Sequence, residues 1–179
     1  VWGNDERFVS TYFSLFRDPQ VYSSFDWGIQ DKDGYHYILG RTDDVINVAG
    51  HRLGTREIEE AIQGHPGIAE VAVVGVADQL KGQSPMAFAV VKDAGSISSL
   101  EKRIELEKAV FKQVDDSLGA IARPSRVHFL TILPKTRSGK LLRRSIQALA
   151  EGRDPGDLTT IEDPAALEQL QLALSSKAA

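Results

Sequence analysis

The sequence has 179 residues, of which 42% are hydrophobic and 26% are charged, and its formal net charge at pH 7 is −4. This length allows one substantial core, or one domain with part of a second. The absence of cysteine excludes disulfides and thiolate zinc sites and is compatible with the cytoplasmic location that we expect. The acidic balance argues against nucleic acid as a partner. No apolar run approaches the roughly 20 residues that cross a bilayer.

Residues 1–43 are rich in aromatic residues and turn signals. The sequence Asp-Lys-Asp-Gly at residues 31–34 separates two apolar runs and predicts a β-hairpin, with Gly34 at a positive φ. The segment has too few long apolar elements to form a core of its own. Because the sequence also opens Val-Trp-Gly without methionine or a signal-like region, we expect a fragment of a longer polypeptide in which residues 1–43 end a preceding, β-rich domain.

Residues 44–150 are predicted to form a compact domain that starts with a strand over 45–48 and a glycine-bracketed turn over 50–54. Thr55 is expected to cap a helix that ends near residues 65–67, where His-Pro-Gly follows. The apolar face of this helix comprises Ile58, Ala61 and Ile62.

Three apolar, β-branched runs at residues 69–76, 86–91 and 127–130 predict a central, mainly antiparallel three-stranded sheet. A long helix is predicted from the stripe Leu100, Ile104, Phe111, Val114 and Leu118, widened by Leu106 and Val110. A last amphipathic helix carries Leu142, Ile146 and Leu149. Helices on one face of this sheet, with a small β-hairpin, give an α+β fold.

Residues 151–179 are predicted to form a C-terminal extension. The composition of residues 152–157 is that of a linker, and Asp-Pro-Ala at 163–165 can start a short helix running through Leu167, Leu170 and Leu172. The last residues, 175–179, are expected to fray.

The segment 133–140, Leu-Pro-Lys-Thr-Arg-Ser-Gly-Lys, places Lys140 at the tip of a basic loop. A lysine held there can stabilise negative charge that grows on a phosphorus centre. The alternative is a surface turn beside a helix N-terminus, where cations are unfavourable. A Walker phosphate loop fits poorly, because Pro134 stands where its first glycine belongs and Leu141 replaces its Ser/Thr.

Two further groups of residues are weaker signals. Asp26 and Arg41 could clamp a ribose diol, although such residues at strand ends are more often turn-formers or surface pairs. The glycines around His51 and Arg52 suit close approach of a phosphate-bearing ligand, but the residue chemistry alone favours a tight turn. The four histidines show neither a nucleophile elbow nor zinc-protease spacing.

Residues 43–59 and 134–140 together strongly resemble the C-terminal part of adenylate-forming acyl-CoA synthetases, and the resemblance runs from about residue 7 to residue 170. The short-chain branch, which acts on acetate and propionate, fits best, and residues 27–29 and 47–57 look more like the propionate enzymes. The resemblance implies an ATP-dependent acid–thiol ligase that uses Mg²⁺, forms an acyl-adenylate and transfers the acyl group to CoA. The family's large N-terminal adenylation domain is missing here, so we expect the fragment alone to be inactive.

By position, the resemblance implies that Lys140 contacts the carboxylate and the α-phosphate during adenylation. It also implies that Lys140 is a target for a lysine acyltransferase and a deacylase, which would remove and restore its charge. It implies nucleotide contacts at Asp26, Arg41 and Arg52, a hinge at Asp43, and a CoA-facing stretch at Ala49, Gly50 and His51. Gln63, His65 and Ile68 match a turn that holds a cation in relatives through backbone oxygens.

Three departures from the family pattern stand out. Ser24 and Phe25 replace the usual Thr-Gly before Asp26, Ala49 replaces a serine that is common in acetate enzymes, and Asp115 and Asp116 stand where those enzymes show a basic residue for the CoA phosphate.

Two other functions stay open. One is a non-catalytic nucleotide- or CoA-binding module. The other is nucleic-acid binding through the basic residues Lys135, Arg137, Lys140, Arg143 and Arg144.

Overall fold

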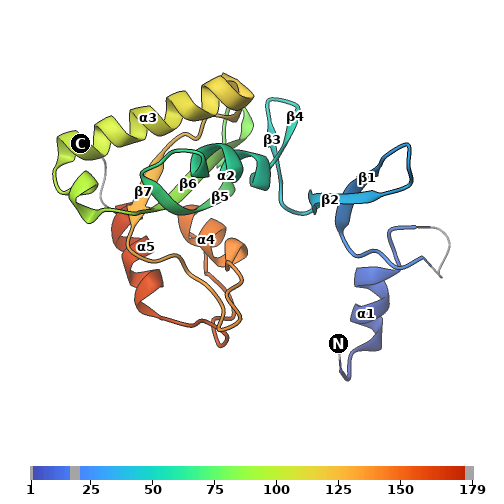
Figure 1. Cartoon of the computed structure of the whole chain (residues 1–179). Helices are drawn as coiled ribbons and strands as arrows, with labels where there is room; N and C mark the ends of the chain where they lie inside the picture. Colours follow the sequence, from blue (N-terminus) through green and yellow to red (C-terminus); the bar gives the residue numbers. More distant parts are fainter. Residues whose placement is uncertain (1, 17–20, 176–179) are drawn as a thin grey trace. The chain divides into compact units, whose positions relative to one another are not determined.

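The computed structural model describes residues 2–16 and 21–175 (Figure 1). The chain divides into two compact units, one up to Asp44 and one from Val45 onward. The fold is α+β, as the sequence predicted. Among the described residues, no helix combines the length and the apolar character that a membrane span requires.

The described residues of the first unit, 2–16 and 21–44, form one helix and one β-hairpin: α1 (Asp5–Tyr12), β1 (Asp26–Gln30) and β2 (His36–Arg41). The antiparallel hairpin confirms the prediction, and Gly34 has a φ of +88°. Helix α1 was not predicted; the Asn4 side chain caps it by accepting a hydrogen bond from the backbone N–H of Arg7 at 2.9 Å. No residue of α1 is buried, in line with a segment that lacks a core of its own.

The second unit is built on the strands β3 (Val45–Val48), β4 (His51–Gly54), β5 (Ile68–Asp78), β6 (Gly82–Val91) and β7 (Val127–Leu130). Strands β5 and β6 form an antiparallel hairpin, and β7 pairs with β6 in parallel, so the three predicted strands do form one sheet, with one antiparallel and one parallel pair. The small hairpin of β3 and β4 joins it through the pair Val48 and Gly82.

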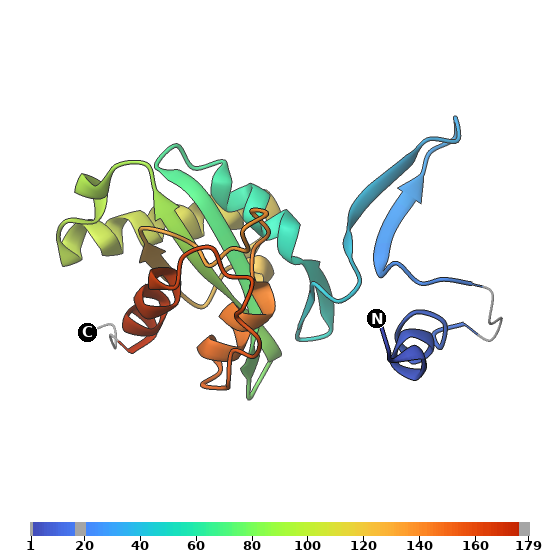
Figure 2. The ribbon, with the colours of Figure 1, turned by 90° about the horizontal axis from the view of Figure 1, so that it is seen from below.

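Helices cover both faces of this sheet, so the prediction of helices on one face is wrong (Figures 1 and 2). One face carries α2 (Thr55–Gln63) and α3 (Leu100–Leu118), and the other carries α4 (Arg143–Ala150) and α5 (Ala165–Ser175). Two 3₁₀ turns flank α3: η1 (Ala94–Ile97) and η2 (Ala120–Ala122). The reason lies in β5, where Val71 and Val73 pack toward α2 and α3 while Ala72 and Val74 pack toward α4 and α5. Strands buried on both faces read as continuous apolar runs.

Two predicted details of the helices are wrong. Thr55 does not cap α2, because Gly54 occupies the N-cap position without a side-chain bond and Thr55 is the buried first helical residue. The second detail is the apolar stripe predicted for α3. The residues of α3 that are buried are Leu106, Val110 and Val114, at i, i+4 and i+8. Leu100, Ile104 and Leu118 are exposed, and the first two line an open groove beside β7.

The C-terminal extension packs onto the second unit. Helix α5 confirms the helix predicted after Pro164, and its Leu170 is fully buried between the sheet and α4. The fraying expected at 175–179 concerns residues that, apart from Ser175, lie outside the described part. Residues 151–175 are therefore an integral part of this unit rather than a loose tail.

Among the described residues, strand β5 has a neighbouring strand on one edge only, and side chains from the helices bond to its other edge. Glu59 of α2 accepts the backbone N–H of Val73 at 2.8 Å, and Gln147 of α4 donates to the carbonyl oxygen of Gly75 at 2.8 Å. Pairing exposed backbone groups in this way protects a sheet edge from another chain.

Candidate active-site elements

The Lys140 segment is a short hairpin loop whose backbone bonds close on themselves. Lys135 and Leu141 are bridge partners, the N–H of Gly139 donates to the carbonyl of Thr136 at 2.8 Å, and the N–H of Thr136 donates to the carbonyl of Lys140 at 2.8 Å. Gly139 has a φ of +80°, which L side chains rarely adopt. This is the three-residue hairpin in which a turn is followed by a glycine bulge.

The side chain of Thr136 fixes this loop from inside. Its Oγ1 accepts the backbone N–H of Lys140 at 3.1 Å and lies 3.0 Å from Oγ of Ser138. No role for Thr136 was predicted from the sequence. A threonine that opens a glycine-containing turn commonly bonds the backbone a few residues on, and that signal could have identified it.

The cations of this segment differ in their surroundings. Lys135 donates to Oε2 of Glu70 at 2.7 Å, and Arg143 donates to Oε2 of Glu59 at 2.5 Å. The exposed side chain of Lys140 makes no hydrogen bond or ion pair within the part of the chain that the structure describes. Its ammonium group is therefore available to an anionic ligand.

The turn between β3 and β4 has only two residues, Ala49 and Gly50, with φ values of +50° and +88°. Two positive φ angles in a two-residue loop are typical of a type I′ turn. The predicted turn over 50–54 is thus too long, because His51–Gly54 is strand β4. Ala49 pays a steric cost there, since alanine has a Cβ and glycine does not.

His51 and Arg52 follow that turn with exposed side chains. They pair with Val48 and Asn47 respectively, and adjacent strand residues point to opposite faces, so the two side chains do not share a face of the hairpin. Arg52 therefore lies next to the Ala49–His51 stretch along the strand, but its side chain is on the other face of the hairpin.

The Lys140 loop and the Ala49 turn lie at opposite ends of the β5–β6 hairpin. The loop is bound to Glu70 through Lys135, whereas the N–H of Ala49 donates to the carbonyl of Lys81 at 2.8 Å, beside the Asp78–Gly82 pair. From Glu70 to Asp78 the strand extends about 26 Å at 3.3 Å per residue. One small ligand cannot contact both elements at once.

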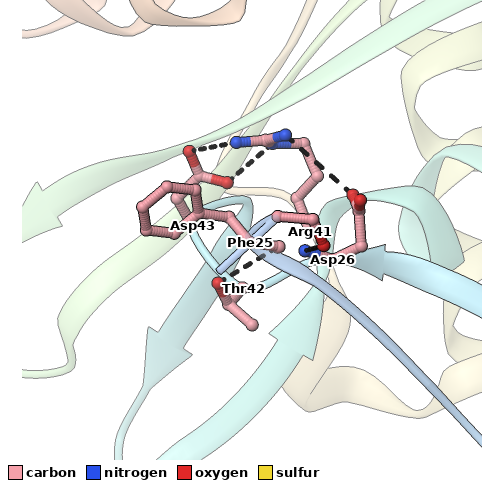
Figure 3. Close-up of polar contacts among 6 residues, drawn as sticks. Phe25, Asp26, Arg41, Thr42 and Asp43 are labelled. Carbon is pink, nitrogen blue, oxygen red and sulfur yellow. Dashed lines mark hydrogen bonds and ion pairs between the residues drawn. The ribbon is translucent and has the colours of Figure 1, made fainter. Parts of the chain in front are cut away.

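In the first unit, Asp26, Arg41 and Asp43 lie together (Figure 3). Arg41 donates to Asp43 through Nε at 2.8 Å and Nη2 at 3.0 Å, and its Nη1 lies 3.9 Å from Oδ1 of Asp26. The hydrogen bond to Asp43 and the nearby carboxylates raise the pKa of Arg41. Asp26 is about half exposed, so its carboxylate can accept hydrogen bonds from a diol.

Phe25 supports this group from a conformation that glycine favours. Its φ is +63°, and Cζ of Arg41 lies 5.9 Å from the centre of its ring (Figure 3). The carbonyl of Phe25 also accepts both the N–H and the hydroxyl of Thr42, at 2.7 and 3.1 Å. Phe25, which stands where the family has glycine, therefore keeps a positive φ that glycine favours and adds a cation–π contact with Arg41.

The turn at residues 63–68 joins α2 to β5. Its polar atoms are bonded locally: the carbonyl of His65 accepts the N–H of Ile68 at 3.1 Å, and the Gln63 amide donates to the carbonyl of Ala69 at 3.4 Å. Among the described residues there is no cluster of three or more His, Asp or Glu that could hold a metal ion. A cation here would depend on backbone oxygens, so this assignment stays a prediction.

Asp115 and Asp116 are each paired with a cation. Asp115 accepts a hydrogen bond from Nε of Arg123 at 2.9 Å, and Asp116 accepts one from Nζ of Lys112 at 2.6 Å. The Arg123 guanidinium holds the pKa of the Asp115 carboxyl below its usual value. The acidic pair is therefore locally neutralised.

Comparison with known proteins finds a family model and several relatives that are similar to this chain. Residues 57–140 match the model of the AMP-binding enzyme C-terminal domain. Over 97% of its length the chain is 63% identical to a propionate–CoA ligase of Escherichia coli K12 and 59% identical to one of Salmonella typhimurium LT2, covering 28% of each. It is 47% identical to an acetyl-coenzyme A synthetase of Pyrobaculum aerophilum, covering 97% of this chain and 25% of that one.

Solved structures agree with the sequence relatives. The anthranilate CoA ligase AuaEII in complex with anthranoyl-AMP superposes with a TM-score of 0.67 at 30% identity, over 84% of this chain and 27% of the ligase. A Mycobacterium tuberculosis fatty acyl CoA synthetase gives 0.57 at 30% identity, over 70% and 23%. The chain thus spans about a quarter of the length of these relatives. Residues 57–140 match the AMP-binding enzyme C-terminal domain model, and the chain as a whole is similar to about a quarter of the length of propionate–CoA ligases.

Proposed function

We propose that this chain is the C-terminal portion of an AMP-forming short-chain acyl-CoA ligase that activates propionate or acetate with ATP and Mg²⁺ and transfers the acyl group to CoA. The observation that carries the proposal is the similarity over 97% of the chain to two propionate–CoA ligases, at 63% and 59% identity. The lower identity to the acetyl-coenzyme A synthetase, 47%, favours propionate over acetate.

In the first half-reaction a carboxylate oxygen attacks the α-phosphorus of ATP and pyrophosphate leaves. Lys140 would approach the carboxylate and the α-phosphate and stabilise the negative charge that grows there. Two observations support this role. The Lys140 side chain is exposed and has no partner among the described residues, and its loop is closed by its own backbone bonds. Acylation of its amine would remove the charge and stop this step until a deacylase restored it.

In the second half-reaction the CoA thiol attacks the acyl carbonyl and AMP leaves. Ala49, Gly50 and His51 would face CoA, and a Cβ added at Gly50 would meet no atom within 4 Å, so the turn is open to close approach. The separation of this turn from the Lys140 loop supports a rotation of the second unit about Asp43 between the two steps. The division of the chain directly after Asp44 supports the same hinge.

The nucleotide would be held by Asp26, Arg41 and Arg52, with the half-exposed Asp26 carboxylate accepting the ribose hydroxyls. Arg41 is oriented by Asp43 and by the ring of Phe25. Mg²⁺ would be bound together with the phosphates of ATP. A second cation at Gln63, His65 and Ile68 would rely on backbone oxygens.

The main partner would be the enzyme's own N-terminal adenylation domain. The first unit exposes large apolar side chains that a larger domain would cover: Trp2, Leu15, Ile29, Tyr35 and Ile38. Since the carboxylate pocket and phosphate loop would lie in that domain, we expect the 179-residue chain by itself to form no acyl-adenylate.

The test uses the full-length protein that contains this chain and measures the two half-reactions separately. Lys140→Ala should lower propionate-dependent ATP–pyrophosphate exchange by about 100- to 1,000-fold, the usual effect of losing one charge-stabilising group. Formation of propionyl-CoA from preformed propionyl-AMP should change by less than about fivefold, and an equal loss in both assays would contradict the role of Lys140.

Lys135→Ala is the matched control, because it removes a cation of the same loop that Glu70 already pairs. Both half-reactions should stay within about fivefold of the parent, since a partly exposed ion pair contributes under about 1 kcal/mol. A loss as large as that of Lys140→Ala would mean that loop charge in general, and not Lys140, drives adenylation.

A further inference from the structure

The Lys140 loop has a third strand, supplied by the C-terminal extension. Thr136 and Ile161 are antiparallel bridge partners. The N–H of Arg137 donates to the carbonyl of Thr160 at 3.1 Å, and the N–H of Glu162 donates to the carbonyl of Lys135 at 2.9 Å. The extension therefore pairs with the loop arm that carries Lys135–Arg137, on the side away from Lys140.

This third strand is anchored in the core on its C-terminal side. Ile161 is 9% exposed, and Ala166 and Leu170 of α5 are essentially buried. Gln169 accepts both the N–H and the hydroxyl of Thr131, at 3.2 and 2.6 Å, where the chain leaves β7 toward the loop. The extension thus contacts the loop segment at two places.

The strand begins in a turn of its own. Oδ1 of Asp157 accepts the backbone N–H of Thr159 at 2.9 Å. This bond, together with a hydrogen bond from the Thr159 side chain, lowers the pKa of Asp157. At the other end, Asp163 accepts the N–H of Ala165 at 2.9 Å and leads into α5. Residues 157–162, which we term the strap, are thus fixed at both ends.

The strap matters because the Lys140 side chain has no partner of its own within the described residues. The loop backbone then decides where the Lys140 side chain starts, and no contact within the described residues restrains its ammonium group further. A two-stranded hairpin is marginally stable in water, whereas a third paired strand restrains it. Misplacing a reacting group by about 1 Å can cost about 100-fold in rate.

We propose that the strap is a positioning element for Lys140, which holds the loop in the geometry that the adenylation half-reaction needs. This inference rests on the proposed function and extends it to residues outside the 57–140 range that matches the family model. The strap would leave thioester formation alone, because the Ala49 turn lies at the opposite end of the β5–β6 hairpin.

The test compares Glu162→Pro with Glu162→Ala in the full-length protein. Proline removes the N–H that donates to Lys135, while alanine keeps it and removes only an exposed side chain. Ile161→Ala is the second variant, in case Glu162→Pro fails to fold: it trims the buried anchor and leaves the backbone bonds in place.

The first measurement is hydrogen–deuterium exchange of a peptide covering residues 135–141. We expect exchange to rise about fivefold or more in Glu162→Pro, less in Ile161→Ala, and not at all in Glu162→Ala. The second is the pair of half-reactions: adenylation should fall about 10- to 100-fold in Glu162→Pro, with thioester formation within about twofold.

Unchanged exchange and adenylation in both Glu162→Pro and Ile161→Ala would overturn the strap, and so would a parallel fall of both half-reactions. The proposed function has a separate outcome. A normal Lys140→Ala enzyme overturns the role of the lysine itself, whereas a defective Lys140→Ala enzyme beside a normal Glu162→Pro enzyme overturns the strap alone.

Discussion

The Lys140 loop and the Ala49–Gly50 turn are both glycine-containing hairpin loops at the two ends of β5–β6, yet they are built differently. The loop is closed by two backbone bonds, by the Thr136 hydroxyl and by the strap. The turn has two residues with positive φ, is flanked by the ladder pair Val48 and His51, and its Ala49 N–H donates to the carbonyl of Lys81. The difference fits the two proposed roles, in which the loop carries a cation on a restrained backbone and the turn allows close approach of a ligand to Gly50.

The loop is also braced where it enters α4. Arg143, the first residue of that helix, pairs with Glu59 of α2, and both side chains are largely buried. Glu59 also accepts the backbone N–H of Val73 at the edge of β5. One carboxylate therefore connects α2, β5 and the C-terminal end of the loop, a role that its place on the helical face did not reveal.

The largest expected effect comes from breaking this brace with Glu59→Ala. The change leaves a guanidinium and a backbone N–H without their acceptor in a buried site, so we expect the free energy of unfolding to fall by about 3 kcal/mol. Urea unfolding of the 179-residue chain measures it. Glu60→Ala is the control, because the Glu60 carboxylate forms an exposed pair with Arg56, and its loss should cost under about 0.5 kcal/mol. An equal loss of unfolding free energy in Glu59→Ala and Glu60→Ala would show that Glu59 does not brace the loop.

An intermediate effect on the free energy of unfolding is expected from pH, through His128, which lies against helix α5 directly after the strap. His128 of β7 stacks on Phe88 at 5.3 Å and donates to the carbonyl of Ala173 in α5. Burial, with help from Arg126, lowers the pKa of His128, while the bond to Ala173 and nearby Glu107 oppose the shift. The unfolded chain therefore binds this proton more readily, and stability is lost as pH falls below about 6.5 toward the lower folded pKa.

Urea unfolding at pH 7.5 and pH 5.5 tests this direction. We expect the parent chain to be less stable at the lower pH, and His128→Phe, which keeps a stacked ring but cannot titrate, to lose less over the same interval. If both proteins lost the same amount, His128 would not be the group responsible.

The smallest effect concerns the turn. Ala49→Gly should raise the free energy of unfolding by about 0.5–1 kcal/mol, because glycine accepts a φ of +50° without the steric cost that alanine pays. Ala61→Gly in α2 is the opposite control and should lower it by about 1 kcal/mol. Destabilisation by Ala49→Gly in urea unfolding would show that the turn is not strained.

The sequence by itself determined the local elements and the motif. Turn chemistry located the β1–β2 hairpin, continuous apolar runs located β5, β6 and β7, and Pro164 marked the start of α5. These features depend on neighbours within a few residues, and so they can be recognised along the chain. The basic, glycine-containing segment that ends at Lys140 belongs to the same class.

Only the tertiary structure decided which face of the sheet each helix covers and which cations are paired. Lys135 and Lys140 have similar chemistry, and only the placement of Glu70, 65 residues away along the chain, distinguishes them. The strap and the Glu59–Arg143 brace likewise join segments far apart in sequence. Such partners carry no local signal, because their contact arises only when the sheet, packed on both faces, brings the segments together.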